Sequence, residues 1–301
     1  MSATRRGIRT VVIVDQPHRR DPMQYELYQF LGASTRMRFL HYDGASLPPC
    51  DALFLGFNYS EHLDALAPAM TRVPVILDNN DIECLVADRR VEALFRSGCV
   101  HLLFTKYYPS AVLDEFARSV GFSPSRICLV PWACDPATYT AGGEKDIDVC
   151  YPVTVAPTWK FHRHRPLIAE IVRNTPNSFV GNVYGAEYLE ILRRSKILVV
   201  DGSDRHAMTQ KYVEGAMSGC LLIGDVPTVP EVAARLFVGG KTMASTHDDW
   251  STLGGVIRAM IEDDTRRLEM ASACRAAVAA EFVLARWGER MQDDILRVLE
   301  W

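Results

Sequence analysis

The sequence has 301 residues, enough for two α/β domains of ordinary size, and its 48% hydrophobic content supports a sizeable core in each. A formal charge of -4 gives no basic excess, so we expect no nucleic-acid partner. The eight cysteines form no C-x-x-C pair, a pattern typical of reduced thiols in a cytoplasmic protein. The first apolar run, residues 11–14, is too short for a signal peptide or a transmembrane segment.

In the first half of the chain, short apolar runs alternate with stretches of helical period. This alternation is typical of parallel sheets covered by helices. We expect strands at residues 10–14, 37–41, 52–55, 73–77, 101–104 and 127–130. Helices are expected between them, at residues 21–31, 61–70, 82–97 and 109–120. These elements predict one doubly wound domain.

Residues 131–145 interrupt the pattern with two prolines and the pair Gly142 and Gly143, which predicts an interdomain linker. The alternation then resumes. We expect strands at residues 147–151, 178–180, 197–200, 221–223 and 237–238. Helices are expected at residues 164–173, 186–194, 209–218 and 229–234, and from residue 249 to the end. The second half therefore predicts another α/β domain.

The most informative segment follows the apolar strand at residues 196–200. Lys211 and Glu214 are three residues apart, which places them on one face of a short helix. Gly219 is expected to end this helix in a left-handed conformation, before the chain enters the sheet again at residues 220–223. A cation and a carboxylate in this arrangement can hold a diphosphate and a ribose hydroxyl.

The segment 201–224 resembles the donor-binding segment of GT-B glycosyltransferases, in particular the group 1 and CgeB-like enzymes. Residues 125–139 resemble the hinge phrase of the same enzymes, with Asp135 and Tyr139 at its aspartate and its aromatic residue. The resemblance implies two doubly wound Rossmann-like domains that face a cleft. It implies an acceptor-binding domain over residues 1–133, a nucleotide-sugar domain over residues 146–285, and a last helix, about 286–301, that packs back on the first domain.

A basic segment before the helix expected at residue 164 is the second candidate for donor binding. Cations and free amides at a helix amino terminus together bind anions, and the resemblance implies that this segment holds the donor diphosphate. Lys160 and Arg163 are the preferred pair and Arg165 is their rival; an exposed basic turn is the alternative. His206 and Thr209, in the loop before Lys211, complete the expected donor set. Such positive charge would replace a metal ion, so we expect neither a metal nor a cofactor besides the sugar nucleotide itself.

The catalytic base is sought at strand ends of the first domain, where the acceptor hydroxyl would lose its proton. Asp15, His18 and Asp81 are the candidates. The resemblance has one departure: many retaining group 1 enzymes carry two glutamates, of which Glu214 matches the second while His206 stands at the first. A retaining mechanism is therefore not carried over.

The function implied is transfer of a sugar from a nucleoside diphosphate donor to a hydroxyl acceptor, which could be a glycan, a lipid-linked molecule or another alcohol. Two alternatives stay open: a noncatalytic protein that binds a sugar nucleotide or a glycan, and a sugar-nucleotide epimerase. A third alternative is the metal-dependent GT-A class, whose D-x-D spacing occurs at Asp146 and Asp148, with a further acidic pair at Asp78 and Asp81. Lys211 and Glu214 could also form a plain surface ion pair.

Overall fold

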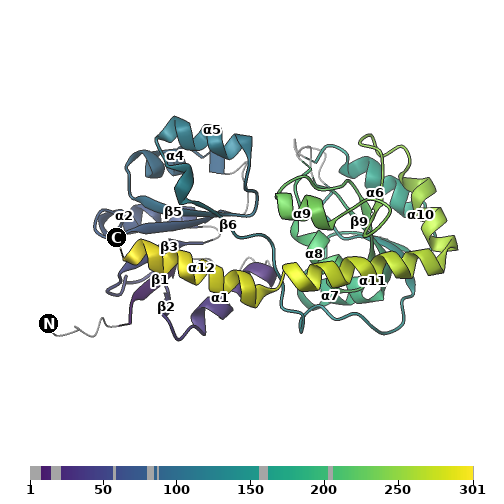
Figure 1. Cartoon of the computed structure of the whole chain (residues 1–301), viewed down its shortest axis with the longest axis horizontal. Coiled ribbons are helices and arrows are strands. Elements are labelled where there is room, and N and C mark those ends of the chain that lie inside the picture. Colours follow the sequence, from purple (N-terminus) through teal and green to yellow (C-terminus); the bar gives the residue numbers. More distant parts are fainter. Residues whose placement is uncertain are drawn as a thin grey trace. The chain divides into compact units, whose positions relative to one another are not determined.

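The structure is a computed structural model (Figure 1) that describes residues 8–14, 22–56, 59–79, 85–86, 88–155, 162–202 and 206–300. At residues 22–25, 60 and 61 it describes the backbone alone. The chain divides into two compact units. Unit 1 comprises Met1–Pro131 and Leu284–Trp301, and unit 2 comprises Trp132–Val283.

Unit 1 is built on a parallel sheet of six strands in the order β2-β1-β3-β4-β5-β6. The strands are β1 (Thr10–Val14), β2 (Arg38–His41), β3 (Ala52–Leu55), β4 (Val75–Asn79), β5 (Val100–Thr105) and β6 (Ile127–Leu129). The central strands are almost wholly buried, because helices cover both faces of the sheet and leave no room for polar alternation.

Helices α2 (Leu63–Met70), α4 (Arg89–Arg96) and α5 (Ala111–Val120) pack on one face of this sheet and share its apolar core. Helix α1 (Pro22–Gly32) lies on the other face, where Tyr28 meets the ring of Phe54 edge to face. The last helix, α12 (Leu284–Leu299), runs beside α1 (Figure 1). There the hydroxyl of Ser34 donates to Gln292 at 2.7 Å. Two short 3-10 turns, Tyr59–His62 and Pro124–Arg126, complete the unit.

The helix expected at residues 82–97 is divided in the described part of the chain: residues 85 and 86 are helical, and a separate helix, α4, follows Asp88. Asp88 has an extended backbone, and its carboxylate accepts a hydrogen bond from the amide of Arg90 at 2.8 Å. An aspartate in this position caps a helix amino terminus, so α4 starts at Arg89. Residues 82–84 and 87, which belong to the expected helix, lie outside the described part of the chain.

Unit 2 contains a parallel sheet of five strands in the order β11-β10-β9-β7-β8. They are β7 (Ile147–Tyr151), β8 (Ser178–Val180), β9 (Ser195–Val200), β10 (Leu221–Gly224) and β11 (Ala244–Ser245). The strand expected at residues 237–238 is wrong. Phe237 ends helix α9 (Glu231–Leu236) and stacks on Phe282, so its apolar side chain packs against rings and β11 forms the sheet edge instead.

Helices α6 (Arg165–Arg173) and α10 (Leu253–Glu262) cover one face of this sheet. On the other face lie α7 (Gly185–Arg194) and α8 (Gln210–Met217), and α8 comes so close that Gly215 lies against the side chains of Leu198 and Leu222. Gly219 has φ +73°, the left-handed conformation expected at the end of α8. The predicted α/β class with two doubly wound parallel sheets is confirmed.

The helical carboxyl-terminal region consists of three helices. After α10, the carboxylate of Asp263 caps α11 (Asp264–Glu281), and Phe282 and Val283 separate α11 from α12. None of these, nor any other helix in the described ranges, is long and apolar enough to cross a bilayer. The cysteines of the described part are free thiols, at positions 50, 99, 128, 134, 150, 220 and 274.

Candidate functional site

Two buried aspartates stand side by side at the carboxyl edge of the unit 2 sheet. Asp201 directly follows β9 and Asp225 directly follows β10, and these two strands are neighbours. Each aspartate is only 6% exposed. Open parallel sheets bind ligands at their carboxyl edge. Buried carboxylates at this edge must be paired, and their partners define the site.

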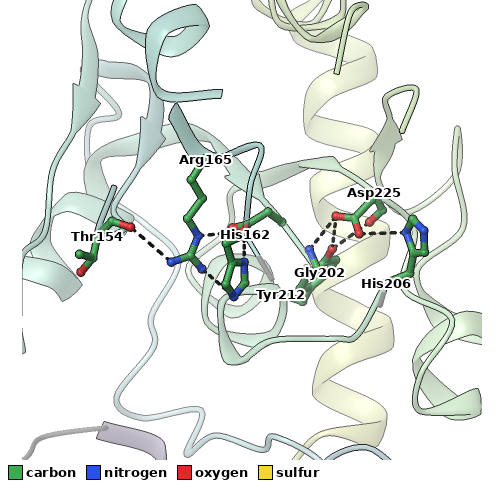
Figure 2. A network of polar contacts seen from close by, with 8 residues as sticks. Thr154, His162, Arg165, Gly202, His206, Tyr212 and Asp225 are labelled. Atoms are coloured by element: carbon green, nitrogen blue, oxygen red, sulfur yellow. Dashed lines mark hydrogen bonds and ion pairs between the residues drawn. The ribbon is translucent and has the colours of Figure 1, made fainter. Parts of the chain in front are cut away.

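Asp201 contacts two basic side chains, His162 and Arg165, both of which are labelled in Figure 2. Nδ1 of His162 lies 2.6 Å from its Oδ2, and Nε of Arg165 donates to the same oxygen at 3.0 Å. Arg165 also donates to the carbonyl of Thr154 at 3.3 Å. Burial acts to raise the pKa of Asp201, but the hydrogen bond from His162 and the charge of Arg165 outweigh it and hold the pKa below its usual value. Asp201 is therefore an ionised, accepting group.

Asp225 accepts three hydrogen bonds. The amide of Gly202 and the hydroxyl of Tyr212 donate to Oδ1 at 2.8 and 2.9 Å, and Nδ1 of His206 lies 3.3 Å from Oδ2. Burial raises the pKa of Asp225, although these donors oppose it. Only glycine fits at position 202, because a Cβ there would lie 2.6 Å from the Asp225 carboxylate and 2.8 Å from the carbonyl oxygen of Ala207.

Glu214 is fully buried within α8, with 0% exposure. Tyr139 donates its hydroxyl to Oε1 at 3.1 Å, and Tyr188 donates to Oε2. Burial raises the pKa of Glu214, opposed by the charge of Lys211 and by both tyrosines. The Nζ of Lys211 lies over the ring of Tyr188, 5.0 Å from its centroid. Lys211 and Glu214 thus share Tyr188, but the carboxylate presents no exposed oxygen to a ribose.

The other expected donor residues differ in their surroundings. Arg165 is buried on Asp201, whereas Arg163 is exposed and donates from Nε to His164 at 3.2 Å. Thr209 is the amino-terminal cap residue of α8, and its side chain makes no capping hydrogen bond. Lys160 lies outside the described residues. The structure therefore brings Arg165, His206, Lys211 and Glu214 to the same end of unit 2.

The expected catalytic bases Asp15, His18 and Asp81 also lie outside the described residues. In unit 1 the described chain places another ionic group at the carboxyl edge of the sheet. Nζ of Lys106, just after β5, lies 3.4 Å from Oδ1 of Asp78 in β4, and both side chains are buried. The hydroxyl of Tyr28 lies 3.4 Å from the other carboxylate oxygen.

The metal-binding alternative at Asp146 and Asp148 is not supported by their surroundings. Both lie at the amino end of β7, at the opposite edge of the sheet from Asp201. Asp146 pairs with Arg194 and Asp148 pairs with Lys196 at 2.6 Å. Within the described ranges, no group of three or more His, Cys, Asp or Glu side chains is arranged to hold a metal ion.

Tyr188, Asp201 and Asp225 were not predicted as site residues, whereas His162 belongs to the basic segment that was expected to bind the donor. The two aspartates carried a readable signal, since each is the first residue after an apolar strand of a parallel sheet. Tyr188 carried none, because its contact with Glu214 joins two segments that are far apart in the chain.

Comparison with known families and solved structures gives one family match and several structural matches. Residues 149–293 match the family model described as glycosyl transferase-like. This range contains both aspartates, both histidines, Lys211 and Glu214. The comparison with curated proteins found no match.

Solved glycosyltransferase structures have the same fold over nearly the whole chain. HepE of Anabaena, solved with UDP and glucose, matches with a TM-score of 0.68 and 12% identity, covering 96% of this chain and 100% of that one. Sucrose-phosphate synthase of Thermosynechococcus elongatus matches with a TM-score of 0.64 and 10% identity, covering 97% and 99%. An alpha-glucosyltransferase solved with UDP and DNA matches with a TM-score of 0.66 and 8% identity, covering 96% and 100%. The family match and these structures confirm the resemblance to GT-B glycosyltransferases.

Proposed function

From a glycosyl transferase-like domain over residues 149–293 and a GT-B fold, we propose that this chain transfers a sugar from a nucleoside diphosphate sugar to a hydroxyl acceptor. The bond between the anomeric carbon and the diphosphate oxygen breaks, and its electron pair leaves with the diphosphate. The acceptor oxygen bonds to the anomeric carbon and releases its proton. The finer features proposed here are the donor site, the absence of a metal from the reaction and the kind of acceptor.

The proposal depends on one observation: at the carboxyl edge of the unit 2 sheet, buried carboxylates hold several basic side chains in place. Asp201 fixes His162 and Arg165, and Asp225 fixes His206. Lys211 lies in the first turn of α8. Cations positioned in advance stabilise the charge that develops on a departing diphosphate, so we propose metal-independent transfer.

Within this site we assign phosphate binding to Lys211 and Arg163, and a positioning role to Arg165 and Glu214. Arg165 is occupied by Asp201 and by the carbonyl of Thr154. Glu214 holds Tyr188, over whose ring Lys211 lies. The ribose contact first expected of Glu214 would require one tyrosine hydroxyl to leave the carboxylate. We therefore propose that Glu214 positions Lys211 through Tyr188.

For the acceptor we propose a hydroxyl of a glycan, a lipid-linked molecule or another alcohol. The similar alpha-glucosyltransferase was solved with DNA. The net charge of -4 in this chain is unsuited to the phosphate backbone, so we propose no nucleic-acid acceptor here. The base that takes the acceptor proton stays a prediction at Asp15, His18 or Asp81.

The direct experiment measures release of nucleoside diphosphate from UDP-, GDP-, ADP- and TDP-sugars, with and without a panel of hydroxyl acceptors. Acceptor-dependent release is expected for one donor. Donor binding without release would favour the noncatalytic alternative, and conversion of the donor without an acceptor would favour an epimerase.

A matched pair of variants tests the location of the site. Lys211→Ala is expected to weaken donor binding about tenfold or more, since it removes a charged partner of the phosphates. Lys196→Ala removes the same charge at the opposite edge of the sheet, where the lysine pairs with Asp148, and is expected to leave donor affinity unchanged. Equal donor affinity in both variants would refute the assignment.

A further inference from the structure

The two histidines of the site are held in different ways. His162 uses both ring nitrogens, because Nδ1 meets Asp201 and Nε2 lies 3.4 Å from Nη2 of Arg165. His206 uses Nδ1 on Asp225, and its Nε2 has no hydrogen-bond partner within the described ranges. Figure 2 shows one edge of the His206 ring turned to Asp225. His206 is thus the histidine with a ring nitrogen available to a ligand.

The support behind His206 is rigid and buried. The side chain of Asp225 is 7% exposed, whereas that of His206 is 39% exposed. The other carboxylate oxygen of Asp225 is taken by the amide of Gly202 and the hydroxyl of Tyr212. Because an ionised carboxylate only accepts hydrogen bonds, Nδ1 of His206 carries the hydrogen when it contacts the ionised Asp225. The remaining nitrogen, Nε2, is therefore the one that meets solvent or a ligand.

The backbone of His206 is also fixed in an unusual conformation. Its φ is +48°, in the left-handed region that few residues other than glycine adopt. The carbonyl of His206 accepts from the amide of Thr228 at 2.7 Å, and the next residue, Ala207, pairs with Val229. Such strain persists only where surrounding contacts enforce it, and it concentrates at functional sites. Here it holds a partly exposed imidazole against a buried carboxylate.

We propose that His206 donates a hydrogen bond from Nε2 to a phosphate oxygen of the nucleoside diphosphate, with Asp225 holding the positively charged ring. This inference rests on the proposed function and names a contact within the same site. As the sugar leaves, negative charge grows on the diphosphate, and a donor fixed in advance stabilises it without giving up its proton. A neutral ring that accepts from a sugar hydroxyl is the competing role.

The experiment compares binding of UDP with binding of uridine by calorimetry; if another base is preferred, the corresponding diphosphate and nucleoside are used. His206→Asn is the main variant, because asparagine tolerates the left-handed backbone but cannot extend the ring's hydrogen bond. It is expected to weaken UDP binding about 10- to 100-fold and to leave uridine binding unchanged. Asp225→Asn, which keeps the shape of the support and removes its charge, is expected to act in the same direction.

Control measurements distinguish loss of the phosphate contact from misfolding of the variant and from failure of the proposed function. His101→Asn, in β5 of unit 1, is expected to change neither affinity. Circular dichroism monitors folding, and His206→Gln serves if the asparagine variant does not fold. Equal loss of UDP and uridine binding, or no loss of either, would overturn the phosphate contact while the proposed function stands. Failure of the unmodified protein to bind any nucleoside diphosphate would overturn both.

Discussion

The hydroxyl of Tyr139 lies 3.1 Å from Oε1 of Glu214, and the hydroxyl of Tyr188 occupies the other oxygen of the same carboxylate. Tyr139 comes from the segment after residue 131 and Tyr188 from α7, so two distant segments meet on one residue of α8. The carboxylate of Glu214, which was expected to bind the donor, therefore links two distant segments to α8 inside unit 2.

Loss of either tyrosine hydroxyl is expected to destabilise the protein. Tyr139→Phe and Tyr188→Phe each remove one donor from a fully buried carboxylate, which costs about 1–3 kcal/mol. Urea titration measures the free energy of unfolding. Tyr184→Phe is the matched control, because Tyr184 is 66% exposed and its loss should change stability by less than about 0.5 kcal/mol. Equal effects of all three changes would show that Glu214 does not depend on its partners.

The two buried aspartates are expected to give opposite dependences of stability on pH. The pKa of Asp201 is lowered, chiefly by His162 and Arg165 working against burial, so its stabilising contribution is complete above about pH 3.8 and is lost as the pH falls through the folded-state value. The difference in unfolding free energy between the unmodified protein and Asp201→Asn should therefore shrink in acid.

Asp225 supplies the contrast, because burial raises its pKa. Its ionisation costs stability, so the difference between the unmodified protein and Asp225→Asn should fall as the pH rises above about 3.8. The unfolding free energies are measured from pH 2.5 to 7, about the range over which both aspartates titrate. These measurements show whether the contribution of each aspartate to stability rises or falls with pH. If the unfolding free energy depended on pH in the same way in both variants, the opposite pKa shifts of Asp201 and Asp225 would be contradicted.

Substitution of the two arginines of the basic segment is expected to have different effects, one on stability and the other on donor binding. Arg165→Ala removes the arginine from the buried carboxylate of Asp201 and should cost about 3–5 kcal/mol. Arg163→Ala removes an exposed side chain and should change stability by less than about 0.5 kcal/mol, while it weakens donor binding. Urea titration and calorimetry on both variants provide the check. Strong destabilisation by Arg163→Ala would refute its assignment as a ligand.

Close packing of α8 on the sheet predicts opposite effects of the same substitution at two helical glycines. In Gly215→Ala the new Cβ would lie 2.3 Å from Leu198 and 2.9 Å from Leu222, and such overpacking costs about 1–3 kcal/mol. In Gly255→Ala, on the exposed side of α10, nothing lies within 4 Å, and the helix should gain about 0.5–1 kcal/mol. Thermal unfolding of both variants should shift in opposite directions.

Most of the fold could be predicted because its strands are short apolar runs and its helices have a clear period. The expected strand at residues 237–238 was wrong because an apolar pair can serve a helix end as well as a sheet. Phe237 packs on Phe282, a residue far along the chain that no local pattern connects to it. The break at Asp88, whose carboxylate caps α4, was not predicted because the helical period of the sequence continues across it.

The donor segment could be predicted as a location but not as a set of contacts. Lys211 and Glu214 stand on α8 as their spacing indicated. Burial of Glu214 depends on Tyr139 and Tyr188, which lie 75 and 26 residues away in the chain. Spacing within one helix carries no information about such partners.

Unit 1 is assembled from both ends of the chain, since α12 belongs to it while Trp132–Val283 form unit 2. During synthesis the ribosome therefore releases the first sheet long before the helix that covers α1. Until then Phe30, which lies so close to Gly288 that a Cβ there would be 2.4 Å from its ring, lacks that neighbour. In unit 1 the layer formed by α1 and α12 is therefore completed only after all of unit 2 has been synthesised.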